Sequence, residues 1–359
     1  MMIDYLRGRI RLPVPLPCTV HDGHFMSVDA LGGVQTVTAK RKRVVGSFEA
    51  VMMLRAPSTG EIEFEGNPAK FLQGHNLYGT DDPVALLWAA LCRIEATPGA
   101  LPCKLSDIGL VSADGLSLYT ELSRVDCTAM FLLDTPGDVD SFLRAAQVAG
   151  RLRDRGRSGL GKAYAGGGVV FGDASGKSFT HRQIIWYSKG RELQKNSLPE
   201  PFMGRDDAMG WVKRTLRCEV RLGRNYLKKA GLRVLSDWSA EKTASEWRSM
   251  VDRMDWNEAD VQPANLDGLS PTLRGVHAMW LTGADLSQVY PRATFYRHRS
   301  AILKALSVDI SIPCPKEPTA HVVPIKRRIE LKLAGRPPWA DEIDAELRKA
   351  GAFVFDQVA

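Results

Sequence analysis

The chain has 359 residues, of which 44% are hydrophobic and 25% charged, which fits two or three folded domains and excludes an intrinsically disordered protein. Lys and Arg total 48 against 41 Asp and Glu, so the net charge of +7 suits a partner that carries phosphates. No run nears the roughly 18 apolar residues of a membrane-spanning helix, and the six cysteines form no Cys-x-x-Cys pair. We therefore expect a cytoplasmic protein without membrane partners.

Short β-prone runs separated by turn residues fill the first 65 residues, at 3–12, 34–40, 44–54 and 62–64. This pattern predicts an antiparallel sheet. A loop rich in Gly and Asn follows at 68–79, and Asp82-Pro83 is a typical start for a helix over 83–95.

The middle of the chain alternates predicted strands with one helix. A strand is expected at 116–133, and apolar residues at helical spacing follow Pro136. Four arginines alternate over 151–157, either in a solvated loop or against a DNA backbone.

Strands at 169–171 and around Tyr187 are joined by Gly-x-x-x-Gly-Lys-Ser, one residue short of the Walker spacing. We therefore exclude an ATPase and expect Lys177 near DNA.

The predicted domains are 1–235, with the sheet, a helical linker region over 236–269, a helical module over 270–325, and a basic tail with a terminal helix over 326–359. Ser270 and Pro271 start the first of three short helices, which end near 283, 289 and 306. The third carries Arg292, Arg297 and Arg299 near its start. It is either the recognition helix of a helix-turn-helix-like module or a basic solvent-exposed helix.

Residues 178–193 place polar side chains at alternate positions of an apolar, β-prone run. In a strand, His181, Tyr187 and Lys189 project from one face and Arg182 from the other. This is either an amphipathic strand with a solvated face or a tyrosine nucleophile with a proton acceptor and a cation beside it.

Two further strands carry a polar pair at the same two-residue spacing. Arg124 with Asp126 and Arg217 with Glu219 would each lie on one face of a sheet. They are either structural Arg–carboxylate bridges or part of a shared functional face.

The run His-Arg-x-x-x-x-Tyr-x-Lys-x-x-Glu-Leu resembles the active-site segment of the filamentous-phage rolling-circle replication initiators, the gene II/X family. Other blocks resemble the family in the same order, among them Gln-Gly-His-Asn at 73–76, Ser-Arg-Val-Asp at 123–126 and Arg-Cys-Glu-Val-Arg at 217–221. The resemblance implies an α+β fold, an antiparallel sheet with flanking helices like the HUH initiators. The chain lacks the His-x-His pair of those initiators, because no two of its histidines are spaced by two.

The resemblance also implies an activity: a Mg²⁺-dependent tyrosine DNA endonuclease, or nickase, with strand-transfer and ligase activity through a 5′-phosphotyrosine. Tyr187 is the expected nucleophile, assisted by Lys189 and His181. Carboxylates suit Mg²⁺, with Mn²⁺ as a substitute, so Asp126 and Glu219 are the expected ligands. His75 is the third candidate ligand.

Its expected partners are phage origin DNA, as double-stranded replicative form and displaced single strand, and a host helicase; an oligomer on the origin is left open. The expected DNA contacts are Arg124, Arg217, Arg182, Lys177, Arg292, Arg297 and Arg299. The alternative is a non-catalytic DNA-binding regulator of phage replication or transcription.

Overall fold

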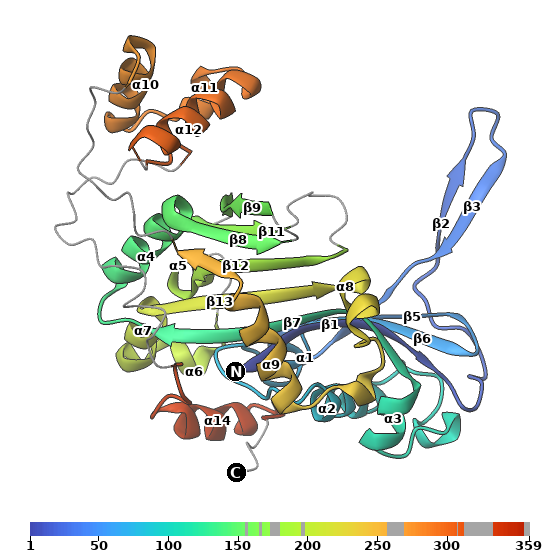
Figure 1. Ribbon diagram of the computed structural model, residues 1–359. Helices are drawn as coiled ribbons and strands as arrows, with labels where there is room; N and C mark the ends of the chain where they lie inside the picture. Colours follow the sequence, from blue (N-terminus) through green and yellow to red (C-terminus); the bar gives the residue numbers. More distant parts are fainter. Residues whose placement is uncertain are drawn as a thin grey trace.

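The computed structural model describes residues 1–154, 157–164, 167–172, 180–194, 198–256, 269–306, 308–311 and 333–354 (Figure 1). Its centre is a nine-stranded sheet in which all neighbouring strands pair antiparallel. In spatial order the strands are β10 (Lys162–Tyr164), β11 (Gly168–Gly172), β12 (Arg182–Ser188), β13 (Thr215–Gly223), β7 (Thr120–Leu132), β1 (Met2–Arg11), β6 (Glu61–Gly66), β5 (Val51–Ser58) and β4 (Lys42–Val45).

Cross-strand pairing gathers polar side chains on one face of this sheet. Tyr187 of β12 lies opposite Arg217 of β13, and Arg221 of β13 lies opposite Asp126 of β7. Directly opposed residues share a face, so these groups form one polar surface. The same surface continues across β1 and β6 with the opposed pairs Arg7–Glu65, Arg9–Glu63 and Arg11–Glu61.

Helices cover the other, apolar face. α4 (Pro136–Ala149) starts with a capping box made by Thr135, and its Phe142 ring lies 5.1 Å from that of Trp186 in β12. α9 (Ala240–Val251) places Trp247 against β13, where its indole N–H donates to the Cys218 carbonyl at 3.4 Å. The predicted α+β class, an antiparallel sheet with helices, is therefore confirmed.

The remaining helices of this body are short apart from α2, and none of the described helices is long and apolar enough to cross a membrane. They are α1 (Pro68–Gln73), α2 (Pro83–Glu95), α3 (Ala113–Tyr119), α5 (Lys189–Leu193), α6 (Glu200–Met203), α7 (Asp206–Lys213) and α8 (Arg224–Ala230). Asp82 caps α2 by accepting hydrogen bonds from the backbone N–H groups of Val84 and Ala85, so the predicted helix over 83–95 is confirmed.

Four predicted elements have different bounds. The run 44–54 is broken into β4 and β5 by a turn with positive φ at Phe48 and Glu49. The run 116–133 begins as the end of α3 before β7. Of the four alternating arginines, Arg151 and Arg153 lie on β8 (Gly150–Asp154) and Arg157 lies on β9 (Arg157–Leu160) rather than in a loop, while Arg155 lies outside the described residues. Finally, β12 ends at Ser188, whose side chain caps α5.

The segment after residue 235 belongs largely to the main body. α9 and β14 (Met254–Trp256) contribute Trp247, Met250 and Met254 to its core. β14 pairs with β8 and β8 with β9 in a separate small sheet. Only 257–268 of the predicted linker lies outside the described residues.

The end of the chain also returns to the main body. α14 (Ala340–Lys349) buries Ile343 and Leu347 in the main core, and Trp339 packs edge-on against Phe202. The Asp344 carboxylate accepts a hydrogen bond from the Tyr78 hydroxyl at 2.7 Å. The predicted terminal helix is present, but it packs as part of the first domain instead of forming an independent tail.

Three helices between these segments form a second core. They are α10 (Pro271–Leu281), α11 (Leu286–Val289) and α12 (Arg292–Leu306), as predicted. Ser270 caps α10 by accepting from Leu273 N–H. Phe295, Ile302 and Leu306 of α12 are buried in this core.

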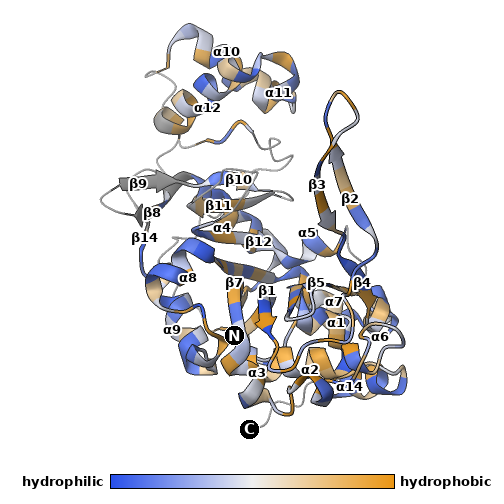
Figure 2. Ribbon diagram, turned by 90° about the vertical axis from the view of Figure 1, so that its right-hand side faces the viewer, coloured by the Kyte–Doolittle hydropathy of each residue, from blue (hydrophilic) through white to orange (hydrophobic). Residues whose placement is uncertain are grey.

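A β-hairpin, β2 (His24–Val28) with β3 (Val34–Ala39), projects from the body beside β5 and β6 (Figures 1 and 2). Every residue of β2 is exposed, and apolar side chains such as Phe25, Met26 and Val37 stand in solvent.

Candidate catalytic site on the polar face

Tyr187 lies near the end of β12, with its hydroxyl beside a carboxylate of the neighbouring strand. That hydroxyl donates a hydrogen bond to Glu219 Oε2 at 3.2 Å, and the Arg217 guanidinium lies 5.9 Å from the Tyr187 ring centre. Burial raises the pKa of Tyr187 well above its usual value near 10, and the positive charge of Arg217 opposes this only in part. A neutral phenol within reach of a carboxylate is the arrangement that base-assisted attack requires.

Glu219 shares an arginine with a second carboxylate, that of Asp126. Arg221 Nε lies 2.5 Å from Glu219 Oε1 and 3.6 Å from Asp126 Oδ2. Arg124 binds both oxygens of Asp126, at 2.7 and 2.5 Å. Burial raises the pKa of the Asp126 carboxyl to about 7, although Arg124 opposes the shift. The two acids therefore approach one point on the polar face, and two arginines balance their charge.

A buried polar network lies on the other side of Tyr187. Arg217 is fully buried and binds Asp4 Oδ1 at 2.7 Å and the Asn76 carbonyl at 2.8 Å. Lys189 is also fully buried and donates to Asn76 Oδ1 at 2.7 Å and Glu192 Oε2 at 2.6 Å. Burial lowers the pKa of Lys189 to about 8, with Arg217 adding to the effect. Arg217 thus lies inside the protein beside Tyr187, and its predicted contact with DNA stays a prediction.

His75 does not join the two carboxylates. Its ring lies 4.5 Å from that of Tyr78 and 5.0 Å from that of Phe202, and burial lowers its pKa to about 3. The described residues contain no group of three or more His, Cys, Asp or Glu side chains placed to hold a metal ion. The structure therefore does not bring His75, the predicted third ligand, to the two carboxylates, because the Gln-Gly-His-Asn loop places its ring among aromatic side chains.

Asp126 and Glu219 by themselves fit a Mg²⁺ ion. Proteins usually hold Mg²⁺ through one or two carboxylates, with water and substrate phosphates as the other ligands. Thr128 lies opposite Glu219, and its buried hydroxyl has no hydrogen-bond partner among the described residues. These donors are all oxygens, which Mg²⁺ prefers. Arg221, which contacts both carboxylates, would have to move before an ion could bind between them.

Two further predicted residues lie outside this cluster. His181 precedes β12, six residues from Tyr187 or roughly 20 Å along a strand, and its ring lies 6.2 Å from Tyr226. It is therefore too distant to take the Tyr187 proton. Arg182 is buried on the apolar face, 3.7 Å from the Met250 sulfur, which corrects its predicted DNA contact. Lys177 lies outside the described residues.

The three arginines of α12 differ in their surroundings. Arg292 and Arg297 are exposed. Arg299 instead binds the buried Asp309 carboxylate with two nitrogens, at 2.6 and 2.5 Å. Its guanidinium therefore holds the end of the helical module, and the predicted DNA contact at Arg299 stays a prediction.

Sequence reasoning missed three groups of the site: Arg221, Asp4 and Asn76. The signal for Arg221 was available, because Arg217, Glu219 and Arg221 alternate on one strand. Asp4 sits at an irregular pairing between β1 and β7, and Asn76 lies in a loop. Neither position follows from a strand or helix period.

Comparison with known proteins identifies the family of the chain. The chain matches two family models for the phage replication-associated protein encoded by gene II, the N-terminal one over residues 2–241 and the C-terminal one over residues 274–344. It is 30% identical over 355 residues to the replication-associated protein of Enterobacteria phage I2-2, covering 94% of this chain and 98% of that protein.

The corresponding replication-associated proteins of Enterobacteria phages f1 and M13 are also 30% identical, over 206 residues, which are 52% of this chain and 45% of each relative. No solved structure matches the chain. The first family match contains the whole Tyr187 cluster. The chain therefore belongs to the gene II family of filamentous-phage replication-associated proteins.

Proposed function

We propose that this protein initiates rolling-circle replication by nicking one strand of the phage origin and later rejoining it, with Tyr187 as the nucleophile. The observation that carries the proposal is the hydrogen bond from the buried Tyr187 hydroxyl to Glu219 Oε2. Family membership supports phage origin DNA as the substrate.

The chemistry follows from the neighbours of each oxygen. Tyr187 Oη attacks the phosphorus of the scissile phosphodiester, while its proton passes to Glu219 Oε2. The bond from phosphorus to the 3′ oxygen breaks, and that oxygen takes a proton from water. The 5′ end stays on Tyr187 as a phosphotyrosine, which stores the ester bond.

Rejoining reverses these steps. An incoming 3′-hydroxyl attacks the phosphotyrosine and releases its proton to water, and the phenolate leaves and recovers the proton held by Glu219. Because Tyr187 is only 8% exposed, neighbouring side chains must move before a phosphate reaches its oxygen.

Charge on the transferring phosphate needs a positive environment. Arg221 lies on the strand that carries Glu219, and Arg217 lies beside the Tyr187 ring. When bound by Asp126 and Glu219 Oε1, Mg²⁺ would polarise the phosphate oxygens. Glu219 Oε2 faces the Tyr187 hydroxyl and Oε1 faces Arg221. One carboxylate thus has one oxygen to accept the proton and another to bind the cation.

A supercoiled plasmid carrying the cognate origin, incubated with Mg²⁺, tests the proposal. Tyr187→Phe removes one hydroxyl, so folding and origin binding should persist while nicking and the covalent DNA adduct vanish. Tyr226→Phe is the matched control, because the Tyr226 hydroxyl also donates to a glutamate, Glu246, at 2.8 Å.

Nicking by Tyr187→Phe at the wild-type rate would contradict the assignment. If the wild-type protein binds the origin without any cleavage, the alternative of a non-catalytic DNA-binding regulator holds instead.

A further inference from the structure

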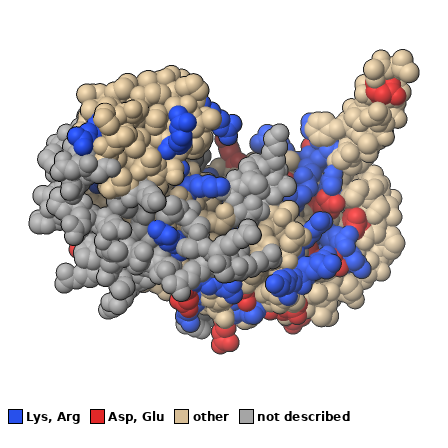
Figure 3. Space-filling model, turned by 45° about the horizontal axis from the view of Figure 1, so that its top comes forward, with Lys and Arg blue, Asp and Glu red and all other residues tan. Residues whose placement is uncertain are grey.

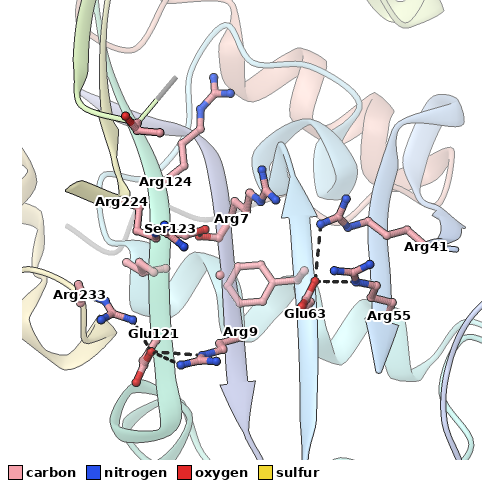
Figure 4. A pocket seen from close by; sticks show the side chains of 14 residues that line it. Arg7, Arg9, Arg41, Arg55, Glu63, Glu121, Ser123, Arg124, Arg224 and Arg233 are labelled. Atoms are coloured by element: carbon pink, nitrogen blue, oxygen red, sulfur yellow. Dashed lines mark hydrogen bonds and ion pairs between the residues drawn. The ribbon is translucent and has the colours of Figure 1, made fainter. Parts of the chain in front are cut away.

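A groove lined by arginines lies on the polar face beside the Tyr187 cluster. Its cavity measures about 570 Å³, and its walls carry seven arginines and two glutamates (Figure 4). Gly8 forms part of its lining, where a Cβ atom would lie 2.5 Å from the Glu121 carbonyl oxygen and 2.9 Å from the Phe64 ring. A side chain at this position would therefore clash with the neighbouring strands.

The two glutamates hold several arginines in place without neutralising the groove. Glu121 Oε2 is bound by Arg9 at 2.9 Å and Arg233 at 2.6 Å, and Glu63 Oε2 is bound by Arg55 at 2.7 Å. Glu65 pairs with Arg7 and Arg41, and Asp126 pairs with Arg124, so the seven arginines of the lining exceed these four carboxylates by three and leave an excess of positive charge. Fixed guanidinium groups with excess charge favour an anionic ligand.

Two arginines of the groove are well placed to bind such a ligand. The Arg7 side chain is 50% exposed, with Nε 3.2 Å from Glu65 Oε2. Arg224 is exposed at the start of α8, and its side chain has no hydrogen-bond or ion-pair partner in the part of the chain that the structure describes. In Figure 3, lysines and arginines gather on this side of the molecule, near the base of the β2–β3 hairpin.

The lining indicates which part of a nucleic acid would bind. Phe64 is the single aromatic residue of the lining among the described residues, and it is 1% exposed. Base stacking needs an exposed aromatic ring, whereas guanidinium groups bind phosphates. The groove therefore suits a phosphodiester backbone and offers no aromatic platform for base stacking.

The groove is also continuous with the catalytic cluster. Arg124 belongs to its lining and binds Asp126. Asp126 lies 3.6 Å from Arg221, which binds Glu219, the partner of the Tyr187 hydroxyl. A backbone lying in the groove would thus lead toward the nucleophile.

We propose that this groove binds the phosphate backbone of DNA, independently of sequence, and directs the strand toward Tyr187. The inference rests on the proposed function, because DNA is its ligand. Duplex and single-stranded DNA share this backbone, so the test includes both.

The test measures DNA affinity by fluorescence anisotropy at several salt concentrations. The double variant Arg7→Gln/Arg224→Gln should weaken binding to origin and unrelated DNA alike, and its log K against log salt slope should fall by about 1.8 on duplex or about 1.4 on single strands. The arm with the reduced slope identifies the form that the groove binds. Arg7→Lys/Arg224→Lys keeps both charges and should keep the slope.

The matched control is Arg248→Gln/Arg253→Gln, which removes two exposed arginines from α9 and its C-terminal end, on the opposite side of the sheet. Its slope should equal that of the wild type. A groove variant with the wild-type slope on both forms of DNA, or one no different from the control variant, would overturn the inference.

This result is separable from the proposed function. Tyr187→Phe should lose the covalent adduct but keep the salt slope. If that variant still nicks while the groove variant loses slope, the nucleophile assignment fails and the groove stands. The reverse pattern overturns the groove alone.

Discussion

Replacing Glu219 by Gln tests the proton acceptor at nearly constant volume. The amide keeps a polar contact to the Tyr187 hydroxyl, which lies 3.2 Å from Oε2, but it cannot take a proton. Because burial holds the pKa of Tyr187 above 10, fewer than about one phenol in a thousand is ionised at pH 7. A general base typically contributes about 10²–10⁴ in rate, so we expect adduct formation to fall by about 10²–10³, or about 3–4 kcal/mol in the barrier.

The assay is single-turnover formation of the covalent adduct on an origin oligonucleotide at saturating Mg²⁺, which separates proton transfer from loss of a metal ligand. The variant's rate should rise more steeply with pH than that of the wild type, since hydroxide must then remove the proton. Glu246→Gln makes the same change at the partner of the Tyr226 hydroxyl and should leave the rate unchanged. Adduct formation by Glu219→Gln at the wild-type rate would refute the reasoning.

Five other changes have defined outcomes. Asp126→Asn should raise the Mg²⁺ concentration needed for nicking, with partial rescue by Mn²⁺; unchanged metal dependence would argue against a ligand role. Arg297→Ala should cost about 1–3 kcal/mol in binding to the origin and little with random DNA, whereas Arg299→Ala, which breaks the bridge to Asp309, should lower the melting temperature of the helical module. Trp339→Ala should cost about 3–5 kcal/mol in the free energy of unfolding, because α14 packs into the main core; an unchanged value in chemical denaturation would mean that it does not. His75 has a folded pKa of about 3, below the 6.5 of an unfolded chain. The folded state therefore binds fewer protons than the unfolded state between these pH values. Acidification from pH 6.5 to 5 should lower the free energy of unfolding of the wild type by about 2 kcal/mol more than that of His75→Phe. Equal losses in both proteins would contradict the burial argument.

The helix starts were predictable because the signals are local. Asp82-Pro83, Thr135-Pro136 and Ser270-Pro271 each combine a side-chain acceptor with a proline that needs no hydrogen-bonding N–H group. The break between β4 and β5 was not predictable. It requires positive φ at Phe48 and Glu49, which their residue types do not favour. The turn also packs closely against α1, because a Cβ at Gly46 would lie 2.3 Å from the Phe71 carbonyl oxygen.

The two-residue period of a strand predicts which residues of the site share a face, but it does not predict the distances between them. A period of two places Asp126, Tyr187 and Glu219 on faces that strand pairing then joins, as the observed register confirms. The same period gives His181 the right parity but says nothing of its separation from Tyr187. Lys189 reaches its buried position from the first residue of a helix, because Ser188 ends the strand.

Charge balance explains how one cluster can be both a stable bridge and a reactive site. Asp126 and Glu219 are matched by Arg124 and Arg221, so removing any one of them leaves a charge uncompensated in a largely buried setting. In the proposed reaction, a phosphodiester group (−1) and a divalent cation (+2) would together add one positive charge, with the arginines turning to the phosphate and the carboxylates binding the cation. The sequence left structural Arg–carboxylate bridges and a functional face as alternatives. In the proposed reaction they would be two states of the same four side chains.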